Sequence, residues 1–154
     1  MEEVQKFILL YEKAIEYRKL VLDNTNSRKE AINYARQNLD RQELKNFFKI
    51  GELNNEQMEI LGTNISVIKF SLDSLIKNLI EHADLNFSSY NLILPNIVSL
   101  PDCVQQDRKL NLRMFRRVDD KLYEVVIKTT KNKQENYLTS FHRCDDSKLK
   151  HKKR

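Results

Sequence analysis

The spacing of apolar residues changes along this chain from a helical repeat to a two-residue repeat, and that change limits the folds open to it. Up to about residue 82 the apolar positions recur every three or four residues, as at Phe7 and Tyr11. From about residue 110 they alternate with polar positions, as at Leu112 and Met114. Helices followed by strands predict an α+β fold, with helices first and a small sheet after them.

The helical half divides into several predicted segments. Apolar spacing predicts helices over residues 4–22, 28–38, 40–50, 54–61 and 72–81. Ser27 and Ser71 precede two of them and are placed to cap their first turns. Residues 65–70 are rich in β-branched side chains, which predicts a short strand before the last helix. Residues 87–100 predict short helical turns, broken by Pro95 and Pro101.

The second half predicts an antiparallel meander of three strands. The strands are expected over residues 110–115, 122–129 and 137–142, joined by short polar turns. We therefore expect a helical N-terminal element over residues 1–49 and an α+β domain over residues 50–146, in which a helix packs on a small antiparallel sheet. Residues 147–154 carry five basic side chains and one more histidine, and they predict a disordered basic tail.

Composition removes several classes of function. Two glycines in 154 residues leave no glycine-rich loop to cradle a nucleotide phosphate, so no nucleotide cofactor is expected. No apolar run reaches the length of a membrane span, and the acidic start does not resemble a secretory signal. Cys103 and Cys144 have neither zinc spacing nor a disulfide-rich pattern, so we expect no metal site and a cytoplasmic, reducing location.

Charge is distributed unevenly along the chain. Residues 1–100 carry 12 lysines and arginines against 14 acidic residues, whereas residues 101–154 carry 15 against 8. A basic half on a near-neutral support indicates an anionic partner, of which nucleic acid is the commonest. A solvated basic surface with a basic tail is the competing interpretation.

The residues able to do acid–base chemistry lie in two places. His82 ends the predicted helix that also carries Lys77, and Ser140, His142 and Arg143 lie together on the last strand. Metal-independent RNA cleavage needs a base for the 2′-hydroxyl, an acid for the leaving 5′-oxygen and a cation for the phosphate. Histidine titrates in the range for the first two tasks, and arginine or lysine suits the third. An isolated histidine beside an apolar helix face is more often structural, so the pattern leaves the identity of the base open.

Several blocks of the chain, taken in order, resemble one family. The blocks are residues 68–82, which hold a strand, a capping serine, Lys77 and His82, and then residues 89–90, 94–98, 101–102, 122–128 and 137–143. This order is similar to that of phage-associated nucleases of the barnase/EndoU/colicin/RelE-like group. The resemblance covers about residues 50–143 and implies a helix packed on an antiparallel sheet that cleaves RNA without a metal. It implies catalytic roles for Lys77, His82, Ser140 and Arg143.

The same strands carry residues suited to holding the RNA. Arg113 and His142 can contact phosphate, Thr139 can hydrogen-bond it, and Tyr137 can stack on a base. The leading hypothesis is a metal-independent ribonuclease of toxin or phage-effector type, acting on tRNA or mRNA. Such an enzyme implies a second partner, a neutralising antitoxin or immunity protein. The alternatives are a non-catalytic RNA-binding module of the same fold, and a helical adaptor that binds a partner protein through residues 1–49.

Overall fold

The structure is a computed structural model that describes the backbone of residues 3–152 and the side chains of residues 3–149. The fold class is α+β, as the sequence predicts. The chain forms two compact units. The helical unit comprises the residues up to Lys49 together with Phe70–Asp84, and the sheet unit comprises Ile50–Lys69 and the residues from Leu85 onward. The helix that carries Lys77 and His82 therefore belongs with the N-terminal helices.

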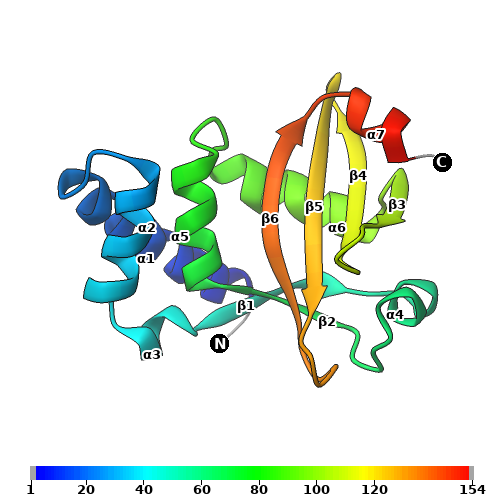
Figure 1. Cartoon of the computed structure of the whole chain (residues 1–154), viewed down its shortest axis with the longest axis horizontal. Helices are drawn as coiled ribbons and strands as arrows, with labels where there is room; N and C mark the ends of the chain where they lie inside the picture. The colour runs from blue at the N-terminus through cyan, green and yellow to red at the C-terminus, as the bar shows by residue number, and fades with distance from the viewer. Residues whose placement is uncertain (1–2, 153–154) are drawn as a thin grey trace. The chain divides into compact units, whose positions relative to one another are not determined.

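The helical unit is held together by a small aromatic core. Its helices are α1 (Glu3–Asp23), α2 (Arg28–Asn38), α3 (Arg41–Leu44) and α5 (Leu72–Glu81), and both α1 and α2 pack on α5 (Figure 1). The Phe7 and Phe48 rings lie 4.8 Å apart between centroids, and the Phe48 and Phe70 rings 5.5 Å apart. Ser27 and Ser71 accept hydrogen bonds from backbone N–H groups of α2 and α5, so both predicted caps are confirmed.

The sheet has six strands in the order β1-β2-β6-β5-β4-β3. Strand β2 pairs with β6 in parallel, whereas β3, β4, β5 and β6 pair antiparallel in sequence. The predicted meander is confirmed as β4, β5 and β6. The strand bounds are β1 (Phe47–Glu52), β2 (Val67–Ser71), β3 (Cys103–Gln106), β4 (Leu112–Val118), β5 (Lys121–Thr129) and β6 (Asn136–Cys144).

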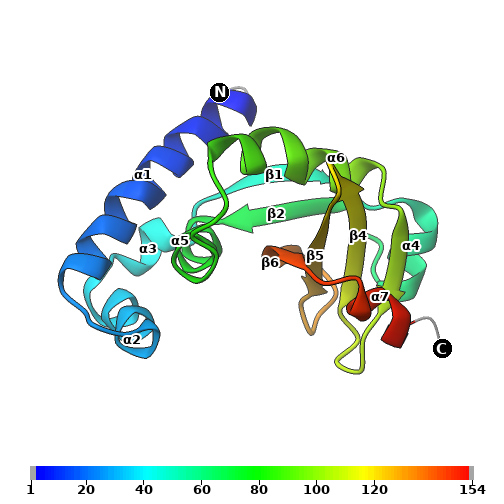
Figure 2. The same ribbon diagram turned by 90° about the horizontal axis from the view of Figure 1, so that it is seen from above.

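One face of the β4–β5–β6 region carries the core of the sheet unit. Helix α6 (Leu94–Ser99), which follows a π-helical turn over Ser89–Ile93, lies against β4 and β5 (Figure 2). Phe141 meets Tyr90 edge-on at 5.4 Å and stacks on Tyr123 at 5.9 Å. These ring contacts show that Phe141 faces the core. Because adjacent residues of a strand point to opposite faces, the residues next to Phe141 on β6 point to the other face of the sheet.

Two predicted elements differ from the structure, and one strand of the structure was not predicted. The helix expected over residues 40–50 ends at Leu44, because the next residues form β1, in which Phe48 and Ile50 alternate into the core. Strand β3 was not predicted, and it is a four-residue edge strand that pairs only with β4. The basic tail begins with a short helix, α7 (Ser147–Lys152), whereas disorder was expected; residues 153–154 lie outside the described part of the chain.

The remaining short helix, α4 (Asn55–Leu61), matches its prediction. Asn54 and Gln57 form a reciprocal capping box at its start, and Gly62 ends it with a left-handed backbone (φ 72°). Within residues 3–152, no helix combines the length and the hydropathy that crossing a membrane requires.

Candidate active site

A β-bulge in strand β6 decides which of its side chains leave the core. Val126 of β5 is opposite Ser140, but the next residue, Ile127, is opposite Leu138, so β6 holds one extra residue, Thr139. The bulge lets Leu138 and Phe141 both enter the core, where each is fully buried. Ser140 is thereby directed to the opposite, open face of the sheet.

The strand register gathers polar side chains on this open face. Glu124 lies opposite Phe115 on one neighbouring strand and His142 on the other. Arg113 lies opposite Val126, which in turn lies opposite Ser140. Arg113, Glu124, Ser140 and His142 therefore project to one side from three adjacent strands.

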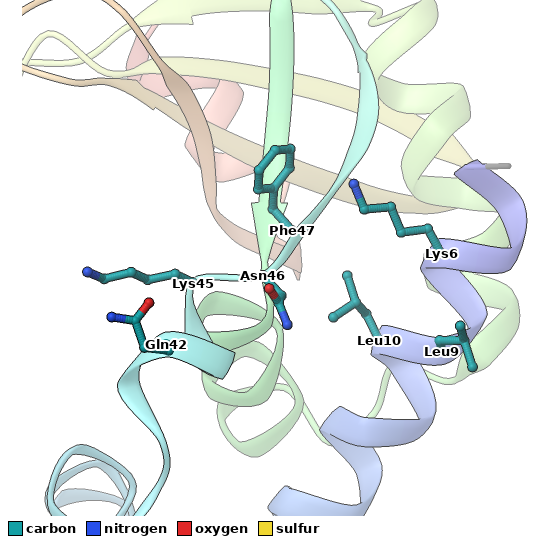
Figure 3. Close-up of a pocket in the computed structure, with 7 residues that line it drawn as sticks. All are labelled: Lys6, Leu9, Leu10, Gln42, Lys45, Asn46 and Phe47. Atoms are coloured by element: carbon teal, nitrogen blue, oxygen red, sulfur yellow. The ribbon is translucent and has the colours of Figure 1, made fainter. Parts of the chain in front are cut away.

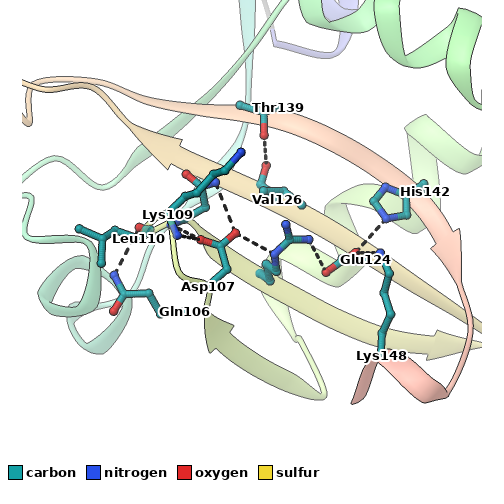
Figure 4. Close-up of polar contacts among 11 residues, drawn as sticks. Gln106, Asp107, Lys109, Leu110, Glu124, Val126, Thr139, His142 and Lys148 are labelled. Atoms are coloured by element: carbon teal, nitrogen blue, oxygen red, sulfur yellow. Dashed lines mark hydrogen bonds and ion pairs between the residues drawn. The ribbon is translucent and has the colours of Figure 1, made fainter. Parts of the chain in front are cut away.

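Glu124 is the centre of this cluster. Its side chain is fully buried, and three cationic or potentially cationic groups reach it (Figure 4). Arg113 Nη1 lies 2.8 Å from Oε2, His142 Nε2 lies 2.8 Å from Oε1, and Lys148 Nζ lies 3.0 Å from Oε1. Lys148 comes from α7, the segment expected to be a disordered tail.

These contacts keep the carboxylate of Glu124 ionised. Burial alone would raise the pKa of Glu124, but hydrogen bonds from His142, Arg113 and Lys148 outweigh burial and hold that pKa far below its ordinary value. Burial alone would also lower the pKa of Arg113, but its bonds to Glu124 and Asp107 raise it. The cluster is therefore a buried anion matched by fixed cations.

Ser140, His142 and Glu124 form a continuous hydrogen-bonded chain. Ser140 Oγ lies 2.8 Å from His142 Nδ1, and the other ring nitrogen bonds Glu124. An ionised carboxylate can only accept a hydrogen bond, so Nε2 must carry a hydrogen. In the neutral imidazole Nδ1 is then the acceptor, and the Ser140 hydroxyl donates to it. This chain can take a proton at Ser140 and stabilise the imidazolium that results.

The loop between β3 and β4 is tied to the same cluster through Asp107. Oδ2 of Asp107 accepts a hydrogen bond from Arg113 Nε at 2.9 Å, while Oδ1 accepts from the backbone N–H groups of Lys109 and Asn111. Burial would raise the pKa of Asp107, but these backbone and guanidinium donors lower it. Arg113 is thus held between two carboxylates, one from the loop and one from the strand.

A hollow of about 890 Å³ lies over these groups. Among the described side chains, four that line it are cationic and Asp107 is the one carboxylate, so the hollow suits an anionic ligand. The lining residues are Gln106, Asp107, Arg108, Lys109, Asn111, Arg113, Val126, Thr139, Ser140, His142 and Lys148.

The structure brings together predicted site residues from the last strand and from β4. Ser140, His142, Thr139 and Arg113 all line the hollow, and Thr139 Oγ1 also donates to the backbone oxygen of Val126 at 3.3 Å. Arg143 is paired with Tyr123, on the face opposite to His142.

The other predicted site residues are not among the described residues that line the hollow. Tyr137 is on β6, with Lys69 Nζ 6.0 Å from the centre of its ring. Lys77 and His82 belong to the helical unit. Lys77 pairs with Asp73 at 3.1 Å, and the backbone N–H of His82 caps α5 by donating to Asn78.

Sequence reasoning missed Glu124, Asp107 and Lys148. A signal for Glu124 was present, because it is a lone charge inside the apolar run of strand β5, and an acidic residue is almost never fully buried without a partner. Asp107 and Lys148 lie in a loop and a basic tail, where charged residues are ordinary. Their roles emerge only from the contacts that the loop and α7 make with Arg113 and Glu124 in the folded chain.

The helical unit has a hollow of its own, of about 630 Å³ (Figure 3). Lys6 and Lys45 are its charged lining residues, and Lys6 Nζ lies 4.7 Å from the centre of the Phe47 ring. Leu9 and Leu10 supply apolar surface. No carboxylate or histidine lines it within residues 3–149, so these residues offer no acid–base pair there.

Comparisons with protein families, curated proteins and solved structures found no significant match to the chain. Within the described residues, no group of three or more histidine, cysteine, aspartate and glutamate side chains is arranged to hold a metal ion. The case for function therefore rests on the geometry of the sheet unit.

Proposed function

We propose that this protein is a metal-independent endoribonuclease whose active site is the basic hollow on the open face of the sheet. The observation that carries the proposal is the buried carboxylate of Glu124, which bonds His142 while Arg113 and Lys148 hold it ionised. A histidine oriented by a carboxylate is a general base, and the surrounding cations attract a phosphodiester. RNA supplies its own nucleophile, the 2′-hydroxyl, so no further cofactor is needed for the reaction.

Proton transfer runs through Ser140, because both ring nitrogens of His142 already have partners inside the protein. The 2′-hydroxyl gives its proton to Ser140 Oγ as the Ser140 proton moves to His142 Nδ1. The 2′-oxygen then attacks phosphorus, and the bond to the 5′-oxygen breaks. The ammonium of Lys148 protonates the leaving oxygen. The products are a 2′,3′-cyclic phosphate and a 5′-hydroxyl.

The cations of the hollow bind the phosphate and stabilise its developing charge. Arg113 donates from Nε to Asp107 and from Nη1 to Glu124, and these two hydrogen bonds fix the plane of its guanidinium. Arg108 and Lys109 line the hollow beside it and attract the neighbouring phosphates. Relative to the sequence-based hypothesis, His142 moves from binding to catalysis. The proposed site does not include Lys77, His82 or Arg143, and variants of His82 and Arg143 test their predicted catalytic roles against it.

The test is cleavage of total tRNA by the purified full chain in the presence of EDTA. We expect His142→Ala to lower the rate by a factor of about 10² to 10⁴, the usual contribution of a general base. Arg143→Ala is the matched control, because it removes the next side chain on the same strand, on the other face. It should retain activity within about threefold.

Two other results would redirect the assignment. Loss of cleavage in His82→Ala with retention in His142→Ala would place the base in the helical unit and overturn the proposed site. RNA binding that weakens steeply with salt, without cleavage by the wild-type chain, would favour the non-catalytic binding module. Neither binding nor cleavage would leave the helical adaptor as the better hypothesis.

A further inference from the structure

The loop between β3 and β4 exposes a leucine in an unfavourable backbone conformation. Leu110 has φ 68°, in the left-handed region that glycine and asparagine usually occupy. Its side chain is 62% exposed, so burial in the core does not explain its presence there. A conformation of this kind persists only where the surroundings impose it, and it is most frequent at functional sites.

Hydrogen bonds hold the loop in this shape. The backbone N–H of Leu110 donates to the Asp107 oxygen, and the Asp107 N–H donates to the Asn111 oxygen, both at 3.0 Å. Gln106 Nε2 donates to the backbone oxygens of Leu110 and of Ile60 in helix α4. The leucine is therefore presented on a rigid loop, which limits the entropy lost when a ligand contacts it.

The residues next to Leu110 in the chain are of the kinds that bind a nucleotide. Leu110 lies beside Lys109 (Figure 4). Its two neighbours in the chain, Lys109 and Asn111, line the basic hollow, as does Arg108, although Leu110 itself is not a lining residue. Cations recognise the phosphate of a nucleotide, and an exposed apolar side chain contacts the face of an unstacked base. Apolar side chains at such positions separate neighbouring bases, which is possible at low cost only where the bases are unpaired.

We propose that Leu110, with Arg108 and Lys109, forms a subsite for an unpaired nucleotide beside the one that is cleaved. The preferred substrate is then single-stranded or looped RNA, and paired RNA is disfavoured. The inference rests on the RNA binding of the proposed function but not on its catalytic step. An apolar contact with one base corresponds to about a fivefold change in affinity.

The experiment measures binding of the full chain to a 2′-O-methyl oligonucleotide, which the 2′-hydroxyl mechanism cannot cleave. Fluorescence anisotropy compares the single strand with the blunt duplex of the same sequence. We expect Leu110→Ala and Leu110→Gly each to raise the Kd for the single strand about fivefold. Glycine accepts the left-handed backbone without strain, so its loss of affinity cannot arise from a collapsed loop. Leu100→Ala is the matched control, because Leu100 is also 62% exposed but its neighbours in the chain, Ser99 and Pro101, do not line the hollow; its Kd should stay within twofold.

Four results would overturn the subsite. They are no measurable binding of the single strand, equal affinity for the duplex, unchanged affinity in both Leu110 variants, and an equal loss in Leu100→Ala. The 2′-O-methyl probe cannot be cleaved, so these affinities can be measured even if the protein does not cleave RNA. Conversely, cleavage lost in His142→Ala with unchanged affinity in the Leu110 variants would refute the subsite while supporting the ribonuclease.

Discussion

Replacing Glu124 with glutamine tests whether the buried carboxylate organises the candidate site. The variant keeps the size of the side chain but removes the charge that Arg113, His142 and Lys148 share. Removing one partner of a buried ion pair costs about 3–5 kcal/mol, because the other partner stays buried without compensation. Lys148 is partly exposed and can return to solvent, and the glutamine oxygen can still accept a hydrogen bond. We therefore expect a loss of about 2–3 kcal/mol in the free energy of unfolding.

Urea denaturation followed by circular dichroism at pH 7 measures this loss. The matched control is Glu135→Gln, which removes the carboxylate that pairs with Lys69 at 2.9 Å. The Glu135 side chain is 42% exposed, whereas that of Glu124 is fully buried, and exposed pairs contribute about 0.2–1 kcal/mol. The control should therefore lose far less than Glu124→Gln. Equal effects of the two substitutions would refute the central role of Glu124 in the cluster.

The difference in free energy of unfolding between the wild type and Glu124→Gln should also depend on pH. The pKa of Glu124 is lower in the folded than in the unfolded chain, so its contribution is complete well above the unfolded pKa, about 4.3, and is lost as pH falls. Glutamine does not titrate. The stability gap between the wild type and Glu124→Gln should therefore narrow by about 1.5–2 kcal/mol between pH 7 and pH 3. A gap that stays constant or widens in acid would contradict the assigned ionisation.

Four further substitutions or measurements probe the sheet unit. Phe141→Ala removes a fully buried ring that contacts two tyrosines and should lower the free energy of unfolding by about 3–5 kcal/mol in urea denaturation. Asn136→Ala leaves two backbone carbonyls beside β2 without their amide donor and should cost about 2 kcal/mol by the same assay. Burial raises the pKa of Cys144 to about 11. In the Cys103→Ser variant, which leaves Cys144 as the thiol measured, iodoacetamide at pH 8 should therefore modify the native protein far more slowly than the urea-unfolded protein. Equal rates would contradict this. Ser140→Ala should lower EDTA-resistant cleavage about a hundredfold, and Ser140→Thr should restore most of it; full activity of Ser140→Ala would exclude the serine relay.

Much of the architecture could be predicted because local pattern and tertiary packing agree there. Ser71, the apolar stripe of α5 and the alternation of β4 to β6 each define an element without help from the rest of the chain. The helix predicted over residues 40–50 is wrong for residues 47–50, since aromatic residues after a helical segment fit either a helix or a strand. Their pairing in the sheet decides in favour of the strand.

The candidate site could be predicted only in part. The strand with Ser140 and His142 was identified, but the orientation of each side chain depends on the extra residue, Thr139. A bulge leaves no signature in the alternation of a short strand, so the sequence does not tell which face Ser140 shares with the residues before Thr139. The family resemblance groups Ser140 with Arg143, although their three-residue spacing places them on opposite faces. The link from His142 to Glu124 joins two strands, and register of this kind is set by tertiary packing.

The central claim is that RNA is cleaved by its own 2′-hydroxyl, activated through Ser140 and His142. The most direct measurement uses a short RNA that carries the mapped cleavage site, together with a copy that has a single 2′-deoxy nucleotide on the 5′ side of the scissile bond. With EDTA present, we predict cleavage of the all-RNA strand to a 2′,3′-cyclic phosphate, identified by mass spectrometry, and no cleavage at the substituted bond. Cleavage at the deoxy position, or products with a 5′-phosphate, would contradict the account.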